Sequence, residues 1–306
     1  MPSWRLQILL GVRLQILLVG LIGVILIAAC DRGGGRGSAR PPGEPAPLVR
    51  RAVYVRDLGG LLANDAERSR LDRLVRERRV TDVIPYGMGP LLATDGGRAT
   101  LAAWIDEVHR GGGRVVAPVA GADRLDGLVR LRADHASAAL DGLITEHEFW
   151  NRPDRAAALD ELLALLAAMR RVAPALGPGG RGIPIGAYLG YPTAAEAAQL
   201  AAAVDFVFLD YSVRSPAGAW RHVHARGGAL RRRFGWFAAA GVAVWPIFYA
   251  AGEVDMRRAL VAGGVGEAER RFQADLAGDA EQAGHRVAGF AYFTVEALPE
   301  PPPIGR

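Results

Sequence analysis

From residue 51 onward, short apolar runs alternate along the chain with longer stretches in which apolar residues recur at helical spacing. Continuous apolar runs are typical of strands buried on both faces of a parallel sheet, and recurrence every three to four residues is typical of a helix with one buried face. The pattern predicts strands over residues 52–56, 82–86, 114–119, 140–149, 183–189, 205–211, 242–249 and 288–295. It predicts helices over residues 64–79, 97–110, 125–133, 153–172, 193–203, 228–240 and 255–282, the last range holding one or two helices.

Eight predicted strands, each separated from the next by a helix, favour an α/β fold of the (β/α)8 TIM-barrel type. An open, doubly wound sheet is the main alternative. Against it, residues 55–60, which follow the first strand, lack the glycine-rich phosphate turn of a dinucleotide-binding sheet. We therefore expect one barrel over residues 50–299, followed by a tail at residues 300–306.

The first 29 residues carry the pattern of a secretory signal segment. Arg5 and Arg13 precede residues 14–29, an uncharged apolar stretch about as long as a signal-peptide core and short for a membrane span. The stretch ends Ile-Ala-Ala before Cys30, which resembles the lipobox of bacterial lipoproteins. An uncleaved transmembrane anchor is the alternative. Because Cys30 is the only cysteine and has no internal disulfide partner, lipidation explains it better.

We therefore expect a cleaved signal peptide at residues 1–29, lipid on Cys30 and a flexible tether over residues 30–49, which are rich in Gly, Pro and Arg. The predicted location is the cell envelope, with the barrel facing the periplasm or the exterior and the membrane bound through the lipid. The net charge of +5 comes from scattered arginines, without a basic stripe that has interleaved aromatic residues, so no nucleic-acid partner is expected.

Functional groups of a (β/α)8 barrel lie at the C-terminal ends of its strands. Aromatic and acidic residues are frequent at these predicted ends. Aromatic faces stack on sugar rings, and paired carboxylates perform acid–base chemistry on glycosidic bonds. We therefore expect a glycan or another polyhydroxylated ligand, without a cofactor or a metal, at a mouth lined by Tyr54, Tyr86, Trp150, Asn151, Tyr188, Asp210, Tyr211, Trp245, Tyr292 and Glu296.

The fourth predicted strand carries the most informative residues, Glu146 and Glu148. Side chains alternate along a strand, so both carboxylates point the same way, into the barrel mouth, with Cα atoms about 6–7 Å apart. Burial and a nearby like charge raise the pKa of a carboxyl group, and Glu148, beside Trp150, is predicted to be a general acid. A structural ion pair with a rim arginine such as Arg56 is the alternative.

The segment from Asp141 to Glu148 resembles the strand-four signature Asp-Gly-x-Asp-x-Asp-x-Glu of family 18 glycoside hydrolases, the chitinase-like barrels. The resemblance implies that Glu148 is the catalytic acid and that Glu146 positions the acetamido group of the substrate. It also implies that Tyr211 is the tyrosine that the family uses at the end of strand six. Ile144 departs from the pattern, because the family has an aspartate there that takes part in its substrate-assisted mechanism.

These residues support three hypotheses of function. The first is an envelope-anchored, glycoside-hydrolase-like protein that acts on an amino-sugar-containing glycan by acid-assisted hydrolysis. The second is a non-catalytic carbohydrate-binding barrel, and the third is a structural barrel that docks a partner. The aspartate missing at Ile144 favours the second hypothesis, and the retained Glu148 favours the first. The sequence leaves open whether the chain is an enzyme.

Overall fold

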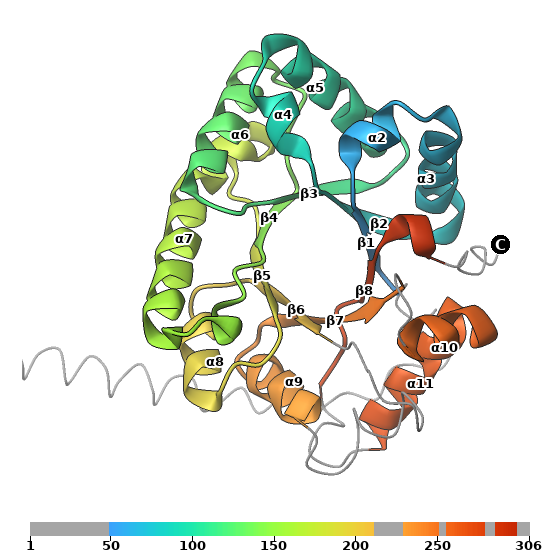
Figure 1. The fold of residues 1–306 in the computed structure, drawn as a ribbon, viewed down its shortest axis with the longest axis vertical. Helices are drawn as coiled ribbons and strands as arrows, with labels where there is room; N and C mark the ends of the chain where they lie inside the picture. The colour runs from blue at the N-terminus through green and yellow to red at the C-terminus, as the bar shows by residue number, and fades with distance from the viewer. Residues whose placement is uncertain (1–48, 211–228, 251–254, 279–284, 299–306) are drawn as a thin grey trace, which may run out of the picture. The chain divides into compact units, whose positions relative to one another are not determined.

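The computed structural model describes residues 49–210, 229–250, 255–278 and 285–298, and these residues fold into a (β/α)8 barrel (Figure 1). Eight parallel strands pair in chain order, and the last strand closes onto the first, as predicted. The strands are β1 (Arg51–Val55), β2 (Val80–Pro85), β3 (Arg114–Pro118), β4 (Gly142–Thr145), β5 (Ile185–Leu189), β6 (Phe206–Asp210), β7 (Ala243–Tyr249) and β8 (Phe290–Phe293). The predictions for residues 1–48, which include Cys30, fall outside the described residues.

The helices form the outer ring of the barrel, and those that the sequence predicted begin and end within a few residues of the expected positions. They are α3 (Asp65–Arg78), α5 (Asp95–Arg110), α6 (Ala122–Asp134), α7 (Arg155–Leu176), α8 (Ala194–Ala201), α9 (Ala229–Ala239), α10 (Asp255–Gly263) and α11 (Val265–Ala277). Side-chain caps fix several of these starts. Asn64 accepts hydrogen bonds from two backbone N–H groups of α3, and Thr193 forms a capping box with Glu196 at α8.

Two short helices that the periodicity did not predict follow the first two strands. They are α2 (Leu58–Leu62) and α4 (Met88–Leu92). Each is five residues long and lies where a strand ends at the mouth of the barrel. Five residues are too few for a helical apolar period to be recognised. Three 3₁₀ turns complete the structure, of which η1 (Phe149–Asn151) follows β4 and η3 (Val295–Ala297) follows β8.

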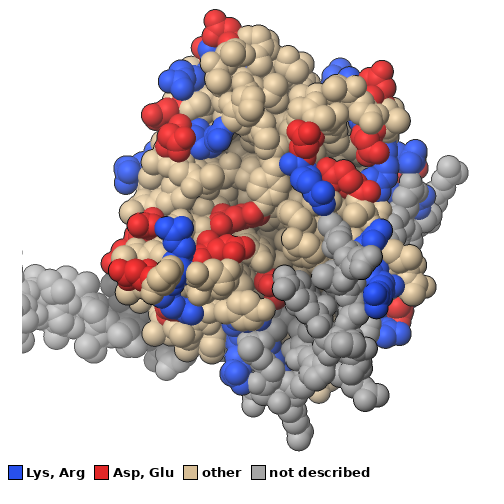
Figure 2. Space-filling model, viewed as in Figure 1, with Lys and Arg blue, Asp and Glu red and all other residues tan. Residues whose placement is uncertain are grey.

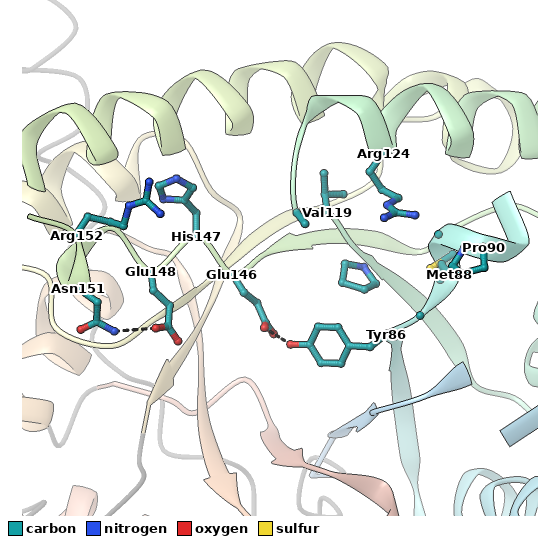
Figure 3. Close-up of a pocket in the computed structure, with 14 residues that line it drawn as sticks. Tyr86, Met88, Pro90, Val119, Arg124, Glu146, His147, Glu148, Asn151 and Arg152 are labelled. Carbon is teal, nitrogen blue, oxygen red and sulfur yellow. Dashed lines mark hydrogen bonds between the residues drawn. The ribbon is translucent and has the colours of Figure 1, made fainter. Parts of the chain in front are cut away.

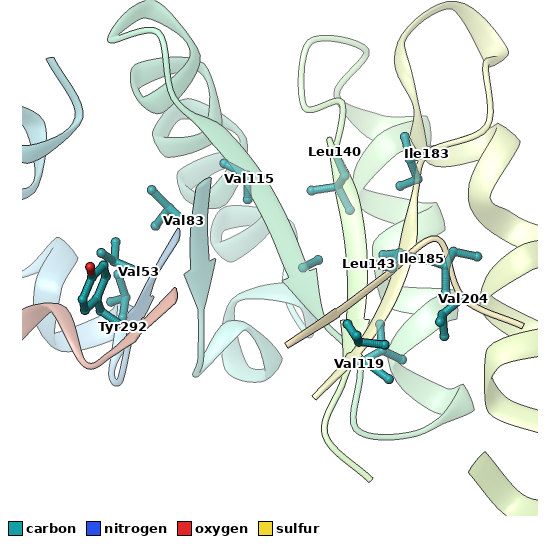
Figure 4. Packing of buried hydrophobic residues seen from close by; sticks show 14 of the residues in the cluster. Val53, Val83, Val115, Val119, Leu140, Leu143, Ile183, Ile185, Val204 and Tyr292 are labelled. Carbon is teal, nitrogen blue, oxygen red and sulfur yellow. The ribbon is translucent and has the colours of Figure 1, made fainter. Parts of the chain in front are cut away.

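Alternation along the strands divides the buried residues into two cores. Outward-facing residues such as Val53, Val83 and Leu143 pack beneath the helices (Figure 4). Inward-facing residues fill the barrel, and several of their aromatic rings contact one another. The ring centroids of Phe206 and Phe208, for example, are 5.5 Å apart. The interior set comprises Ala52, Tyr54, Ile84, Val116, Ile144, Phe206, Phe208, Trp245, Ile247 and Ala291.

Ion pairs surround the N-terminal end of the barrel. Asp82, Asp141 and Asp205 stand near the starts of β2, β4 and β6, and each accepts hydrogen bonds from an arginine or histidine of a neighbouring element. Arg50 reaches Asp82 at 2.9 Å, and Arg170 reaches Asp205 at 2.7 Å. Asp141 and Asp205 also accept from the backbone N–H of the adjacent strand, so these aspartates hold the strand starts in place.

A buried polar network joins the first and last strands. Arg51 on β1 donates two hydrogen bonds to Glu269 on α11, at 2.8 and 2.9 Å, and Tyr292 on β8 donates a third at 2.6 Å. Arg51 also donates to the carbonyl oxygen of Arg78 at the end of α3. These hydrogen bonds are shielded from water, because Arg51 and Glu269 are only 7% and 4% exposed. The network therefore ties β1, β8 and two helices together at the seam where the barrel closes.

No helix within the described ranges has both the length and the apolar character needed to cross a membrane.

Removing the acceptor of the seam network should cost much of the stability. Glu269→Ala leaves a buried guanidinium without its carboxylate, and we expect the free energy of unfolding to fall by about 3–5 kcal/mol. Urea unfolding measures this loss. Glu267→Ala, which removes a partly exposed carboxylate from the same helix, is the matched control and should change the unfolding midpoint little. The double variant Arg51→Met, Glu269→Met should recover most of the loss. Equal losses for the two single variants would contradict this role.

Candidate functional site

A groove of about 620 Å³ opens at the C-terminal ends of β2, β3 and β4 (Figure 3). One wall is the turn and first residues of α4, a second is the segment after β3 with the first turn of α6, and the third is the segment after β4. The groove is lined by Tyr86, Gly87, Met88, Gly89, Pro90, Pro118, Val119, Ala120, Arg124, Glu146, His147, Glu148, Asn151 and Arg152. It therefore lies at the end of the barrel where this fold places its chemistry.

Glu146 stands at the centre of the groove, one residue after β4 ends. The hydroxyl of Tyr86 donates a hydrogen bond to its carboxylate, as the dashed line in Figure 3 marks. Burial raises the pKa of Glu146 above its ordinary value, the charge of Glu148 raises it further, and the hydrogen bond from Tyr86 opposes part of that rise. Glu146 is thus a partly buried carboxyl group that holds its proton more tightly than a glutamate in water.

Glu148 lies in the same groove but is exposed. Its carboxylate accepts a hydrogen bond of 2.7 Å from the side-chain amide of Asn151, which η1 presents three residues later. The expectation that Glu148 would be the carboxyl buried beside Trp150 is wrong, because the chain leaves the strand at Thr145 and turns toward solvent before residue 148. Figure 2 shows acidic side chains gathered near the middle of the barrel face on which α2 and α4 lie.

The alternative of a structural ion pair also fails. Across the part of the chain that the structure describes, neither Glu146 nor Glu148 forms a salt bridge, and Arg56 instead uses its backbone N–H to donate to Glu296 at 3.0 Å. Glu296 is exposed in η3 and lines no part of the groove. The two groove carboxylates are therefore held by a phenol and an amide rather than by cations.

Aromatic rings support the carboxylates from below. Tyr54 in the barrel interior stacks on Tyr86 at 5.5 Å between centroids, and Phe293 lies 5.5 Å from Tyr54 and 4.8 Å from Tyr249. Tyr54 is fully buried, and its hydroxyl lies close to Glu146 without completing a hydrogen bond with it. Burial, together with the charge of Glu146, keeps the pKa of both Tyr54 and Tyr86 well above that of free tyrosine. Both phenols therefore stay protonated next to Glu146.

Trp150 and Tyr188 form the side of the mouth next to β5. Their rings meet edge to face at 5.8 Å, and the indole lies against Gly190, where any larger side chain would overlap with it. Burial raises the pKa of Tyr188, and the charges of Asp210, Glu148 and Glu146 add to the rise. Tyr188 thus lies close enough to Asp210, Glu146 and Glu148 for their charges to affect its pKa.

Besides Glu296, two more predicted mouth residues lie elsewhere. Trp245 faces inward at the N-terminal end of the barrel, where the guanidinium of Arg50 covers its ring at 4.9 Å, because it is the third residue of β7 and the mouth lies four residues further on. Tyr292 faces outward and bonds Glu269, since strand alternation gives the inward positions of β8 to Ala291 and Phe293. Neither residue can touch a ligand in the groove. Tyr211 falls outside the described residues.

Sequence reasoning missed the two arginines of the groove. Arg124 comes from the first turn of α6 and Arg152 follows η1. A lone arginine in a helix or loop carries no periodic signal, and only the three-dimensional arrangement shows that it faces a cavity. His147 both lines the groove and approaches Glu161 of α7 at 3.3 Å.

The described residues hold no group of three His, Cys, Asp or Glu side chains arranged as metal ligands.

No family model matches this chain, and no curated protein matches it. Among solved structures it is similar to a chitinase from Chromobacterium violaceum ATCC 12472, with 10% identity, a TM-score of 0.46 and coverage of 83% of this chain and 96% of that one. It is also similar to a tryptophan synthase from M. tuberculosis, with 18% identity, a TM-score of 0.45 and coverage of 81% and 83%. A dihydrodipicolinate synthase from Agrobacterium tumefaciens str. C58 shares 15% identity, with a TM-score of 0.42 and coverage of 82% and 71%. These proteins differ in activity, and their likeness to this chain carries no argument about its function.

The raised pKa of Glu146 predicts how stability depends on pH. A carboxyl whose pKa is higher in the folded state than in the unfolded chain costs stability as the pH rises above the ordinary glutamate value of 4.5. Glu146→Gln removes the charge and keeps an acceptor for Tyr86. We therefore expect the variant to gain stability over the wild type at pH 8 and to lose that advantage at pH 4.

Thermal unfolding at the two pH values measures the difference. Glu77→Gln, an exposed glutamate of α3, is the control and should show no such trend. A variant that is less stable than the wild type at pH 8 but not at pH 4 would contradict the raised pKa.

Proposed function

We propose that the barrel is a glycoside-hydrolase-like protein that acts on a glycan by acid-assisted hydrolysis, with Glu146 as the proton donor. The observation that carries the proposal is the pair of carboxyl groups in one groove with different surroundings. Glu146 is partly buried, with a raised pKa, whereas Glu148 is exposed. Environments that give two neighbouring carboxyl groups different pKa values are the usual basis for separate acid and base roles on a glycosidic bond.

The proposed reaction needs only water as co-reactant. Protonated Glu146 gives its proton to the glycosidic oxygen as the bond to the anomeric carbon breaks, and the electron pair of that bond stays with the leaving oxygen. Water forms the new bond to the anomeric carbon and gives a proton to the carboxylate of Glu148. Glu148 returns this proton to solvent, and Glu146 takes up a proton from solvent, so both carboxyl groups regain their starting states. The hydrogen bond from Tyr86 stabilises Glu146 after its proton has left.

The assignment differs from the role that the family 18 resemblance implied for these residues. The resemblance gives the acid role to Glu148 and the substrate-positioning role to Glu146. In this chain burial falls on Glu146, and burial raises the pKa of a carboxyl group, so Glu146 holds its proton more tightly than an exposed glutamate does. The exposed Glu148, oriented by Asn151, is better suited to accept a proton from water or to bind sugar hydroxyls.

A non-catalytic, carbohydrate-binding barrel is the second candidate. Ile144, where the family 18 pattern has an aspartate, is fully buried and belongs to the apolar core of the barrel interior. No acidic group of β4 itself therefore stands behind Glu146. The aromatic residues of the mouth would still stack on sugar rings without turnover.

Hydrolysis by the two variants Glu146→Gln and Glu148→Gln separates these candidates. If Glu146 is the acid, Glu146→Gln should lower turnover of a susceptible glycan by roughly two to four orders of magnitude, because the amide cannot supply a proton. Binding of the same glycan should survive. The measurement is the release of reducing ends from a panel of β-linked amino-sugar oligomers.

Glu77→Gln serves as the control with unchanged turnover. Binding without hydrolysis by the wild type would assign the chain to the carbohydrate-binding class. Turnover that Glu146→Gln leaves intact, but Glu148→Gln abolishes, would return the acid role to Glu148.

We also propose that the chain is a lipoprotein of the cell envelope, processed before Cys30. The support is the uncharged apolar stretch over residues 14–29 that ends at a single cysteine, followed by a tether rich in Gly and Pro. Cys30→Ser should leave the precursor unprocessed and without lipid. Metabolic labelling with a fatty-acid analogue tests this expectation, and equal labelling of the variant and the wild type would overturn it.

A further inference from the structure

Two guanidinium groups in the groove have no counter-ion among the residues that the structure describes. Arg124 and Arg152 both line the groove, one at each side of the two carboxylates in Figure 3. Neither guanidinium forms a hydrogen bond or an ion pair with any residue that the structure describes. The closest acidic residues of the groove are already engaged, Glu146 by Tyr86 and Glu148 by Asn151.

Arg124 is the more enclosed of the two. It reaches from α6 toward Met88 and Pro90, and its guanidinium occupies the space over Gly89, where any side chain would overlap with it. Gly87, two residues earlier, has a φ of 81°, which lets the chain turn into α4 and form this wall. Apolar residues line the rest of this end of the groove, among them Pro118 and Val119.

An unpaired guanidinium against apolar walls points to an anionic ligand. A charge that loses water on one side is costly unless an opposite charge or strong acceptors replace it. Guanidinium groups bind carboxylates through two parallel hydrogen bonds, and the planar fork prefers such a ligand over a neutral hydroxyl. The α4 end of the groove therefore has the chemistry of a carboxylate-binding subsite beside the proposed acid.

We infer that the glycan bound in this groove is acidic, and that Arg124 binds a carboxylate carried by one of its sugar rings. The inference rests on the proposed function, which makes the ligand a glycan. A uronic acid and the lactyl ether of muramic acid both supply such a carboxylate. Arg152, exposed at the other side of the groove, adds a weaker attraction that salt screens.

Matched pairs of ligands test the inference. One pair is an oligogalacturonide and its methyl ester, and the other is a disaccharide of N-acetylglucosamine and N-acetylmuramic acid and its methyl ester. Esterification removes the charge and keeps the sugar. Calorimetry on the full chain in detergent should show that the wild type binds the acid of at least one pair roughly tenfold to a hundredfold more tightly than its ester.

Arg124→Met keeps the apolar stem and removes the charge, so it should abolish the preference for the acid while the affinity for the ester stays the same. Arg130→Met, an exposed arginine on the same helix, is the matched control and should keep the preference. If Arg124→Met does not fold, the salt dependence of the wild type replaces it: affinity for the acid should fall with added salt, and affinity for the ester should not.

The pair that shows the preference identifies the source of the carboxylate. Equal affinity for acid and ester in both pairs, no binding of any of the four ligands, or a preference that Arg124→Met retains would overturn the inference. Hydrolysis is scored separately. Acid-selective binding without turnover would overturn the proposed catalysis and leave the inference standing, and turnover of neutral oligomers alone would do the reverse.

Discussion

The barrel depends on the pairing of its first strand with its last. β1 and β8 are separated by more than two hundred residues of sequence, so closing this seam orders the whole domain at a large loss of chain entropy. Three backbone pairs join the two strands, and the buried network of Arg51, Glu269 and Tyr292 adds side-chain bonds that need both strands in register. A one-residue slip would turn Tyr292 inward and leave Glu269 without its phenol.

Closure in turn fixes the functional groove. Once the strands are in register, their C-terminal ends bring Tyr86 of the β2 turn beside Glu146 of the β4 turn, although sixty residues separate them. The carboxyl group then lies against Tyr86, whose ring stacks on Tyr54 of the interior, and its burial there raises its pKa. The chemistry of the groove is thus a product of the barrel rather than of any single motif.

The apolar runs were enough to predict the fold, because each buried parallel strand must be apolar on both faces. The site was harder to predict from the same pattern. The prediction extended strand alternation past Thr145 and therefore buried Glu148. The strand ends at Thr145, and the turn that follows it leaves Glu148 exposed. The prediction also assigned Tyr292 to the inward-facing positions of β8, whereas those positions belong to Ala291 and Phe293. Arg124 was not predicted, because its guanidinium reaches the groove over Gly89 of α4, and the sequence does not show that the two residues are neighbours.

The ion pairs at the N-terminal end have a consequence for how this protein can change. Asp82, Asp141 and Asp205 hold the strand starts, and the groove lies at the opposite end. Asp141 and Glu146 therefore serve different needs although they flank the same short strand, β4. Substitutions around the groove can accumulate without loosening the strand starts, so the ligand preference can drift through evolution or be redesigned in the laboratory while the same frame persists.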